Sequence, residues 1–266
     1  MPAEAGYTLA DLLRVMERLR DPEHGCPWDL KQDFASIAPS TLEEAYELVE
    51  AIEHEDYSHV AEELGDLLFQ VVFYSQLGRE RGLFDMQQVV DTLVAKLLRR
   101  HPHVFADGEI EGVVGSDTSV ADVKQTWEAI KREERAARQQ HGALDDVPVA
   151  LPAISRAQKL QKRAATVGFD WPDVDGVLAK LDEELAELAR AQTDAEREDE
   201  MGDVLFTCVN LARHMGVDAE AALRRASAKF ESRFNTMESR LTAGDARLAD
   251  YDQAALNEAW EAAKKA

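Results

Sequence analysis

The feature that most constrains this chain of 266 residues is an internal repeat of acidic motifs. The pattern Glu-Glu-x-x-Glu at residues 43–47 returns 140 residues later, at 183–187. The pattern Glu-x-x-Asp at residues 63–66 returns 137 residues later, at 200–203. Because both patterns keep their order, we expect the two halves of the chain to fold alike.

The repeat extends beyond the acidic residues. Three further residues of the first half recur 133 residues later in the same order: Lys96, Arg100 and Trp127 match Lys229, Arg233 and Trp260. The offset changes only between predicted helices, as changes in loop length would produce. A single match could arise by chance, but this series indicates a duplication. We therefore predict two domains, 1–145 and 146–266, divided where Gly, Asp and Pro cluster.

Helical periodicity dominates both halves, and turn-forming residues are scarce, with 14 Gly and 8 Pro. Ser40 and Glu43 fit a capping box, which predicts a helix that has Ser40 as its cap and carries the first acidic motif. Three further helices and a loop are expected in the first half: helices over 60–81, 86–101 and 120–140, and a loop over 105–119. The sequence therefore predicts an all-α fold of two tandem helical bundles.

The acidic motifs predict a metal site in each half. Residues three apart share one face of a helix, so each motif presents two carboxylates together, and four meet if the two helices pack antiparallel. Four like charges repel one another unless a divalent cation lies among them. A hard ion such as Mg²⁺, with Mn²⁺ as an alternative, suits an all-carboxylate set. The predicted ligands are Glu44, Glu47, Glu63 and Asp66 in the first half and Glu184, Glu187, Glu200 and Asp203 in the second.

Two other interpretations compete with a metal site. Acidic residues on helices usually form a solvated face, but here the motifs are paired, lie beside apolar residues and occur twice. A di-iron carboxylate bundle needs Glu-x-x-His on two helices, and no Glu in this sequence has a His three residues later. The metal interpretation is therefore the stronger one.

Basic and aromatic residues complete the expected site. Lys229 and Arg233 lie four residues apart, so both can reach a polyphosphate held on the metal. Lys96 and Arg100 repeat this pair as a candidate second site. Salt bridges to nearby Glu residues are the alternative for all four. The indole of Trp260 could stack on a base, or it could pack in a core or a dimer interface.

The chain is strongly acidic, with 30 Lys+Arg against 52 Asp+Glu and a net charge of −22. This balance argues against nucleic-acid binding, which needs clustered basic residues. A single basic stripe is expected to contact either phosphate or an acidic neighbouring subunit; it comprises Arg156, Lys159, Lys162 and Arg163. No apolar stretch is long enough to span a membrane, and no signal peptide is visible. The two Cys residues form neither a disulfide framework nor a zinc site, so we expect a cytoplasmic protein.

These motifs resemble the MazG family of nucleoside triphosphate pyrophosphohydrolases, part of an all-α superfamily that includes the dimeric dUTPases. The family signature, Glu-Glu-x-x-Glu followed after a spacer by Glu-x-x-Asp, stands in both halves. Four further strings, which begin at Cys26, Arg100, Ala157 and Val167, look like those of two-domain MazG proteins. The resemblance covers nearly the whole chain.

The resemblance implies Mg²⁺-dependent hydrolysis of nucleoside triphosphates to nucleoside monophosphate and pyrophosphate by a homodimer of helical bundles. It also implies that four residues bind nucleotide: Lys180, Lys229, Arg233 and Trp260. A water molecule, polarised by the metal and oriented by a carboxylate, would attack in line. Glu183, and Glu43 in the first half, are candidates for orienting this water, although ordinary surface residues are the alternative.

The two halves differ at two informative positions. Asn210 follows the second Glu-x-x-Asp motif by two helical turns, where a nucleobase edge or a ribose could satisfy its amide. The first half has Phe73 there, and it has Ser40 where the second half has Lys180. We therefore expect the second half to be the main catalytic domain, and the first to keep a metal site with weaker or different activity.

Two alternatives stay open from the sequence. A narrower dUTPase-like or dCTPase-like pyrophosphatase would use the same motifs, because base preference depends on the shape of a pocket. A non-enzymatic binding or regulatory module could use the bundles for association alone, although it would not need duplicated carboxylates. A role in nucleotide-pool housecleaning or stress fits the pyrophosphohydrolase interpretation.

Overall fold

The computed structural model describes residues 6–112, 119–137, 142–242 and 247–265. These residues contain ten α-helices and no strand, which confirms the predicted all-α fold. The chain divides into two compact units, Met1–Arg132 and Glu133–Ala266. This division falls inside the helix α5, Val120–Ala137. The domain boundary predicted between residues 145 and 146 stays a prediction.

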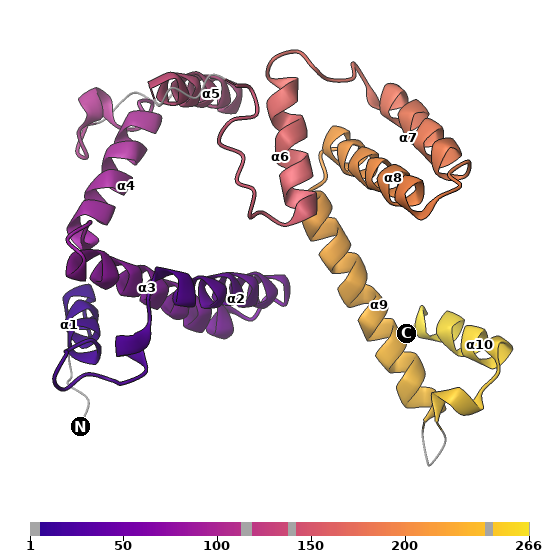
Figure 1. Cartoon of the computed structure of the whole chain (residues 1–266), viewed down its shortest axis with the longest axis horizontal. Helices are drawn as coiled ribbons and strands as arrows, with labels where there is room; N and C mark the ends of the chain where they lie inside the picture. Colours follow the sequence, from indigo (N-terminus) through magenta and orange to yellow (C-terminus); the bar gives the residue numbers. More distant parts are fainter. Residues whose placement is uncertain (1–5, 113–118, 138–141, 243–246, 266) are drawn as a thin grey trace. The chain divides into compact units, whose positions relative to one another are not determined.

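The first unit is built around a hairpin of two helices. Four helices precede α5: α1 (Leu9–Leu19), α2 (Phe34–Glu53), α3 (Tyr57–Glu80) and α4 (Met86–Arg100). The hairpin consists of α2 and α3, which pack against each other and are joined by a short connection (Figure 1). Both α1 and α4 pack on α3. The core between α1, α2 and α3 consists of Met16, Ile37, Val72, Phe73 and Leu77.

The second unit repeats this arrangement. Its helices are α6 (Ala153–Ala165), α7 (Val174–Leu188), α8 (Asp194–His214), α9 (Ala219–Leu241) and α10 (Gln253–Ala263). The hairpin of α7 and α8 corresponds to α2 and α3, and α6 packs on α8 as α1 packs on α3. The long helix α9 contacts α6 and α8, and α10 folds back onto α9 (Figure 1). Three short 3₁₀ segments complete the described structure: η1 (Asp29–Lys31), η2 (Ala106–Gly108) and η3 (Leu248–Asp250).

The predicted capping box at Ser40 is wrong. The helix α2 begins at Phe34, because the carboxylate of Asp33 accepts two backbone N–H groups of the first turn, both at 2.9 Å. Ser40 lies inside the helix, directly after Pro39, which the helix tolerates. Ser40 and Glu43 have the spacing of a capping box inside a helix that is already formed, so the predicted beginning was too late. The first acidic motif therefore lies in the middle of α2.

The other predicted helices of the first half are confirmed to within a few residues. The structure has α3, α4 and α5 where the sequence predicts helices over 60–81, 86–101 and 120–140. Residues 113–118 of the predicted loop and residues 138–140 of the predicted helix lie outside the described residues. Among the helices in the described ranges, none has the length and apolar character that a membrane crossing requires.

Candidate active site

The acidic motifs of the second unit meet between the helices of its hairpin. Glu184 and Glu187 on α7 face Glu200 on α8, and one carboxylate oxygen of each lies within 4.8 Å of the other two. We call these three residues the second triad. Glu184 is only 4% exposed. Burial, followed by the charges of Glu187 and Glu184, raises the pKa of Glu200 above its usual range.

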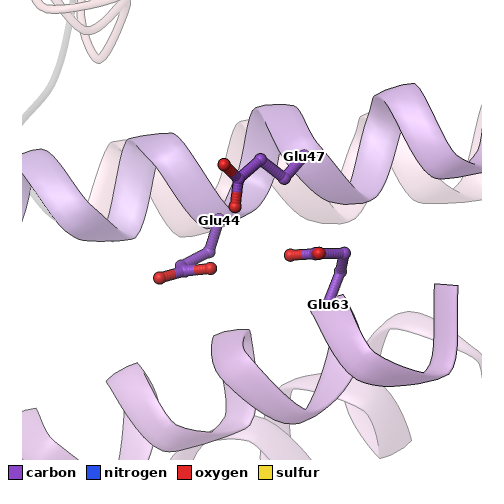
Figure 2. Close-up of side chains that lie close together, drawn as sticks. All are labelled: Glu44, Glu47 and Glu63. Carbon is purple, nitrogen blue, oxygen red and sulfur yellow. The ribbon is translucent and has the colours of Figure 1, made fainter. Parts of the chain in front are cut away.

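The first unit holds an equivalent cluster, which we call the first triad. Glu44 and Glu47 on α2 and Glu63 on α3 also bring three carboxylate oxygens within 4.8 Å of one another. Figure 2 shows Glu44 and Glu47 projecting from one helix toward Glu63 on the facing helix. Burial, followed by the charges of Asp66 and Glu47, raises the pKa of Glu44. The predicted meeting of the carboxylates depended on antiparallel packing of the two helices, and both units contain such a hairpin.

The fourth predicted ligand of each half lies outside the triad. Asp66 and Asp203 are exposed, and neither belongs to the groups of carboxylate oxygens that meet within 4.8 Å. Each nevertheless contributes to the negative field, because Asp66 raises the pKa of Glu44 and Asp203 that of Glu200. Their assignment as metal ligands stays a prediction.

The donor set fits a hard divalent cation. Glu63 Oε2 and Glu200 Oε2 are buried, and neither has a hydrogen-bond partner within the described part of the chain. Unpaired carboxylate oxygens among like charges are unfavourable in a buried site. A cation that prefers oxygen ligands would satisfy them and offset the repulsion, so Mg²⁺ and Mn²⁺ both suit the triads.

The two triads have different positive neighbours. In the second unit, Lys180 Nζ lies 2.8 Å from both Glu183 Oε1 and Glu184 Oε1, and these carboxylates raise the pKa of Lys180. In the first unit, His59 Nε2 lies 2.7 Å from Oε1 of the buried Glu63. His59 was not among the predicted site residues, although its spacing of four residues from Glu63 is the signal for a shared helix face.

A cavity of about 810 Å³ opens beside the second triad. Lys180, Glu184 and Asp203 line it, so its wall carries both acidic and basic groups. The predicted residue Asn210 lines it as well. The remaining wall is largely apolar and includes three aromatic side chains: Phe169, Trp171 and Phe206. A polar wall of this kind beside an aromatic one is typical of a site for a small amphipathic ligand.

A hydrogen-bond network orders one end of this cavity. Arg213 donates to Asn210 Oδ1 from Nε at 3.0 Å and from Nη2 at 2.8 Å. Its Nη1 donates to Asp170 Oδ2 at 2.9 Å, and His214 Nε2 lies 3.0 Å from Asp170 Oδ1. The Arg213 guanidinium and His214 hold the pKa of Asp170 below its usual range. Arg213, which joins Asp170 to Asn210, was not among the predicted site residues.

Comparison with known proteins agrees with this geometry. The MazG nucleotide pyrophosphohydrolase domain matches residues 32–105 and 174–237, once in each unit. The chain belongs to the MazG family. Both matches contain the triad of their unit, so the family match and the structural repeat coincide.

Of three similar proteins, two align over nearly the whole chain and one over 63% of it. A nucleoside triphosphate pyrophosphohydrolase of Escherichia coli (strain K12) is 51% identical over 259 residues, which are 96% of each protein. The nucleoside triphosphate pyrophosphohydrolase/pyrophosphatase MazG of Thermotoga maritima is 43% identical over 98% of this chain and 97% of its own. A nucleoside triphosphate pyrophosphohydrolase of Mycobacterium tuberculosis is 34% identical over 63% of this chain and 48% of its own.

Three residues that the MazG resemblance assigns to nucleotide binding lie elsewhere in the second unit. Lys229 and Arg233 are on α9, and Trp260 is on α10, where its ring lies 5.2 Å from that of Phe230. None of the three lines the cavity. The structure of one chain therefore does not bring them to the second triad, and their predicted roles stay predictions.

The corresponding residues of the first half are also dispersed. Lys96 and Arg100 are half-buried on α4, a helix that packs on α3. Trp127 on α5 has Lys131 Nζ 3.5 Å from its ring centre, so it makes a cation–π contact. The assignment of Lys96 and Arg100 to a second nucleotide site, like that of Glu43 and Glu183 to water orientation, stays a prediction.

The first unit fills the space around its hairpin differently. Phe73, the counterpart of Asn210, is fully buried in the core, and the guanidinium of Arg20 lies 5.3 Å from its ring centre. A cavity of about 220 Å³ in this unit is lined from α1, α3 and α4 and does not include any residue of the first triad. The first triad thus differs from the second in what surrounds it.

Proposed function

We propose that this protein is a metal-dependent pyrophosphohydrolase that cleaves nucleoside and deoxynucleoside triphosphates to the monophosphate and pyrophosphate. The observation that carries this proposal is the contact between the second triad and the cavity. The triad offers a place for a metal-bound triphosphate, and the aromatic wall offers a place for the nucleoside. Full-length relatives that are named nucleoside triphosphate pyrophosphohydrolases support it.

The residues of the second unit have different roles in the proposed reaction. Glu184, Glu187, Glu200 and Asp203 would hold Mg²⁺ or Mn²⁺, which neutralises phosphate charge and lowers the pKa of bound water. Lys180, held at 2.8 Å by Glu183 and Glu184, donates to the phosphate chain from the edge of the cavity. The exposed Glu183 lies beside the triad rather than in it, so it orients the attacking water.

We also propose that the protein is a homodimer, and exposed apolar side chains support this assignment. The hairpin of α7 and α8 exposes large apolar side chains that a soluble monomer would bury: Leu178, Leu185, Met201 and Leu205. A second copy packed on this face would cover them and would supply Lys229, Arg233 and Trp260 to the site from its α9 and α10. We also propose a cytoplasmic role in nucleotide-pool housecleaning, which is compatible with the proposed reaction.

Product analysis tests the proposed reaction. The purified protein is incubated with a mixture of nucleoside triphosphates and millimolar Mg²⁺, and the products are separated by ion-exchange chromatography. We expect monophosphate and pyrophosphate in equal amounts, no reaction with EDTA, and recovery when Mg²⁺ is restored. Orthophosphate and nucleoside diphosphate as first products would contradict the reaction type. The absence of turnover would favour a binding module.

A further inference from the structure

The second triad has a lysine of its own helix as a positive partner. Lys180 lies one turn before Glu184 on α7, and its Nζ is 2.8 Å from Glu184 Oε1. The same Nζ donates to Glu183 Oε1 at 2.8 Å, so two carboxylates hold the ammonium group. The side chain of Glu184 is 6% exposed, whereas that of Lys180 is 33% exposed. A buried member of the triad is therefore paired with a side chain that solvent partly reaches.

The charge of this lysine opposes a free divalent cation. An ammonium group beside a carboxylate neutralises part of the charge that attracts a cation, and it repels the cation itself. The carboxylate oxygens of the triad lie within 4.8 Å of one another. This spacing is well below the Debye length of about 8 Å at physiological ionic strength, so salt screens the repulsion only in part. Lys180 therefore weakens the attraction of the triad for a free cation.

The same charge favours a cation that arrives with a triphosphate. A metal–triphosphate complex carries a net negative charge, which the carboxylates of the triad alone would repel. A lysine ammonium has three N–H donors on a flexible stem, so it can exchange a carboxylate partner for a phosphate oxygen. Lys180 and Glu184 both line the cavity beside the triad. One side chain thus disfavours the cation alone and favours the complex.

The first triad has no lysine at the corresponding place. Ser40 occupies the matching position, four residues before Glu44, and it carries no charge. Glu43 and Glu44 follow it, so the two carboxylates that hold the lysine in the second unit have counterparts here. The first triad is instead contacted by an imidazole from the facing helix, since His59 Nε2 lies 2.7 Å from Glu63 Oε1. The first unit therefore provides a comparison in which the carboxylates are kept and the ammonium group is not.

We propose that Lys180 makes the second triad select metal–triphosphate complexes over free divalent cations. Without substrate, its ammonium group stays on Glu184 and weakens the binding of a free cation. When a triphosphate binds, the phosphate oxygens accept from Lys180, and Glu184 becomes available as a metal ligand. The metal and the triphosphate then strengthen the binding of each other by the same factor, as thermodynamic linkage requires. This inference rests on the proposed function and deepens it by naming the form of substrate that the site binds.

Mn²⁺ binding to one triad at a time tests this role of Lys180. Glu63→Gln weakens the first triad, so it reports on the second, and free Mn²⁺ is followed by electron paramagnetic resonance. In this background, Lys180→Ser should tighten Mn²⁺ binding about tenfold, because it removes the competing charge. Lys180→Arg keeps the charge and should stay within about twofold of its parent. Lys264→Gln removes a lysine that pairs with a glutamate at the end of α10, and it should leave Mn²⁺ binding unchanged.

The lysine can also be moved into the first unit. In a Glu200→Gln background, which reports on the first triad, Ser40→Lys should weaken Mn²⁺ binding about tenfold. His59 is present with and without this substitution, so its contact with Glu63 cancels in the comparison. A nonhydrolysable triphosphate with a methylene bridge between the α and β phosphorus atoms should tighten Mn²⁺ binding to the second triad. This gain should be smaller in Lys180→Ser.

Two outcomes would overturn the role of Lys180. One is a Lys180→Ser protein that binds free Mn²⁺ no more tightly than its parent, and the other is a Ser40→Lys protein with unchanged affinity. If Lys180→Ser does not fold, Lys180→Gln takes its place in the same comparison. Unchanged Mn²⁺ affinities in a protein that hydrolyses triphosphates would overturn this inference and leave the proposed function standing. If the wild type neither hydrolyses triphosphates nor binds the methylene analogue, both are wrong.

Discussion

Each unit carries three carboxylates at equivalent places in a hairpin of two helices, yet the surroundings of the two triads differ. In the second unit, the triad borders a cavity of about 810 Å³ that Asn210 lines. In the first unit, Phe73 stands at the matching position and is fully buried in the core. The comparison teaches that duplicated carboxylates need not have duplicated surroundings. A large apolar side chain can turn space for a ligand into core.

The positive neighbours of the triads extend this comparison. Lys180 approaches the second triad from α7 and borders the cavity, where a phosphate chain could meet it. His59 approaches the first triad from the beginning of α3 and contacts the buried Glu63. The position that matches His59 holds Glu196, which accepts backbone N–H groups at the start of α8, at 2.8 and 3.1 Å. The two hairpins therefore share a pattern of three carboxylates and differ in their other polar contacts.

The largest expected effect concerns Phe73. Phe73→Ala should lower the free energy of unfolding of the first unit by about 3–5 kcal/mol, because it leaves a void in a packed core. The matched variant Asn210→Ala should cost only about 1 kcal/mol, the loss of its hydrogen bonds to Arg213. Hydrogen exchange followed by mass spectrometry would locate each loss in its own unit. Equal losses for both variants would contradict the difference between core and cavity.

The next effect concerns activity. Glu200→Gln should lower kcat/KM for nucleoside triphosphates by about 100-fold, since it removes a charge on which metal binding depends. Glu63→Gln, the same change in the first triad, should lower it less than about threefold. Pyrophosphate release measures both. Similar losses would show that the first unit also turns over substrate and would end the proposed asymmetry.

The smallest effect concerns metal and stability. Mg²⁺ at ten times its dissociation constant should stabilise the protein by about 1.4 kcal/mol, seen as a higher melting temperature, because it offsets repulsion within a triad. Glu63→Gln and Glu200→Gln should each remove part of this rise. Sodium chloride at the same ionic strength is the control. No rise with Mg²⁺ would count against preformed metal sites in both units.

Much of the candidate site could be predicted because its residues lie three or four apart on single helices. Glu184 and Glu187 share a face for this reason, and only the antiparallel packing of α7 on α8 was needed to add Glu200. The start of α2 was mispredicted, because Ser40 and Glu43 match the spacing of a capping box within a helix that Asp33 already caps. Arg213 could not be identified, since its partner Asp170 is 43 residues away in the chain.

The sequence by itself determined the all-α class, the duplication and the pairing of carboxylates, since periodicity and spacing act locally along a helix. Only the tertiary structure decided that the second triad borders the cavity lined by Asn210 and that Lys229, Arg233 and Trp260 lie away from this cavity. These properties depend on how α6 packs on α8 and on the volume that each side chain fills there. Volume and hydrogen-bond orientation are set by residues distant in the chain, so a linear pattern does not contain them.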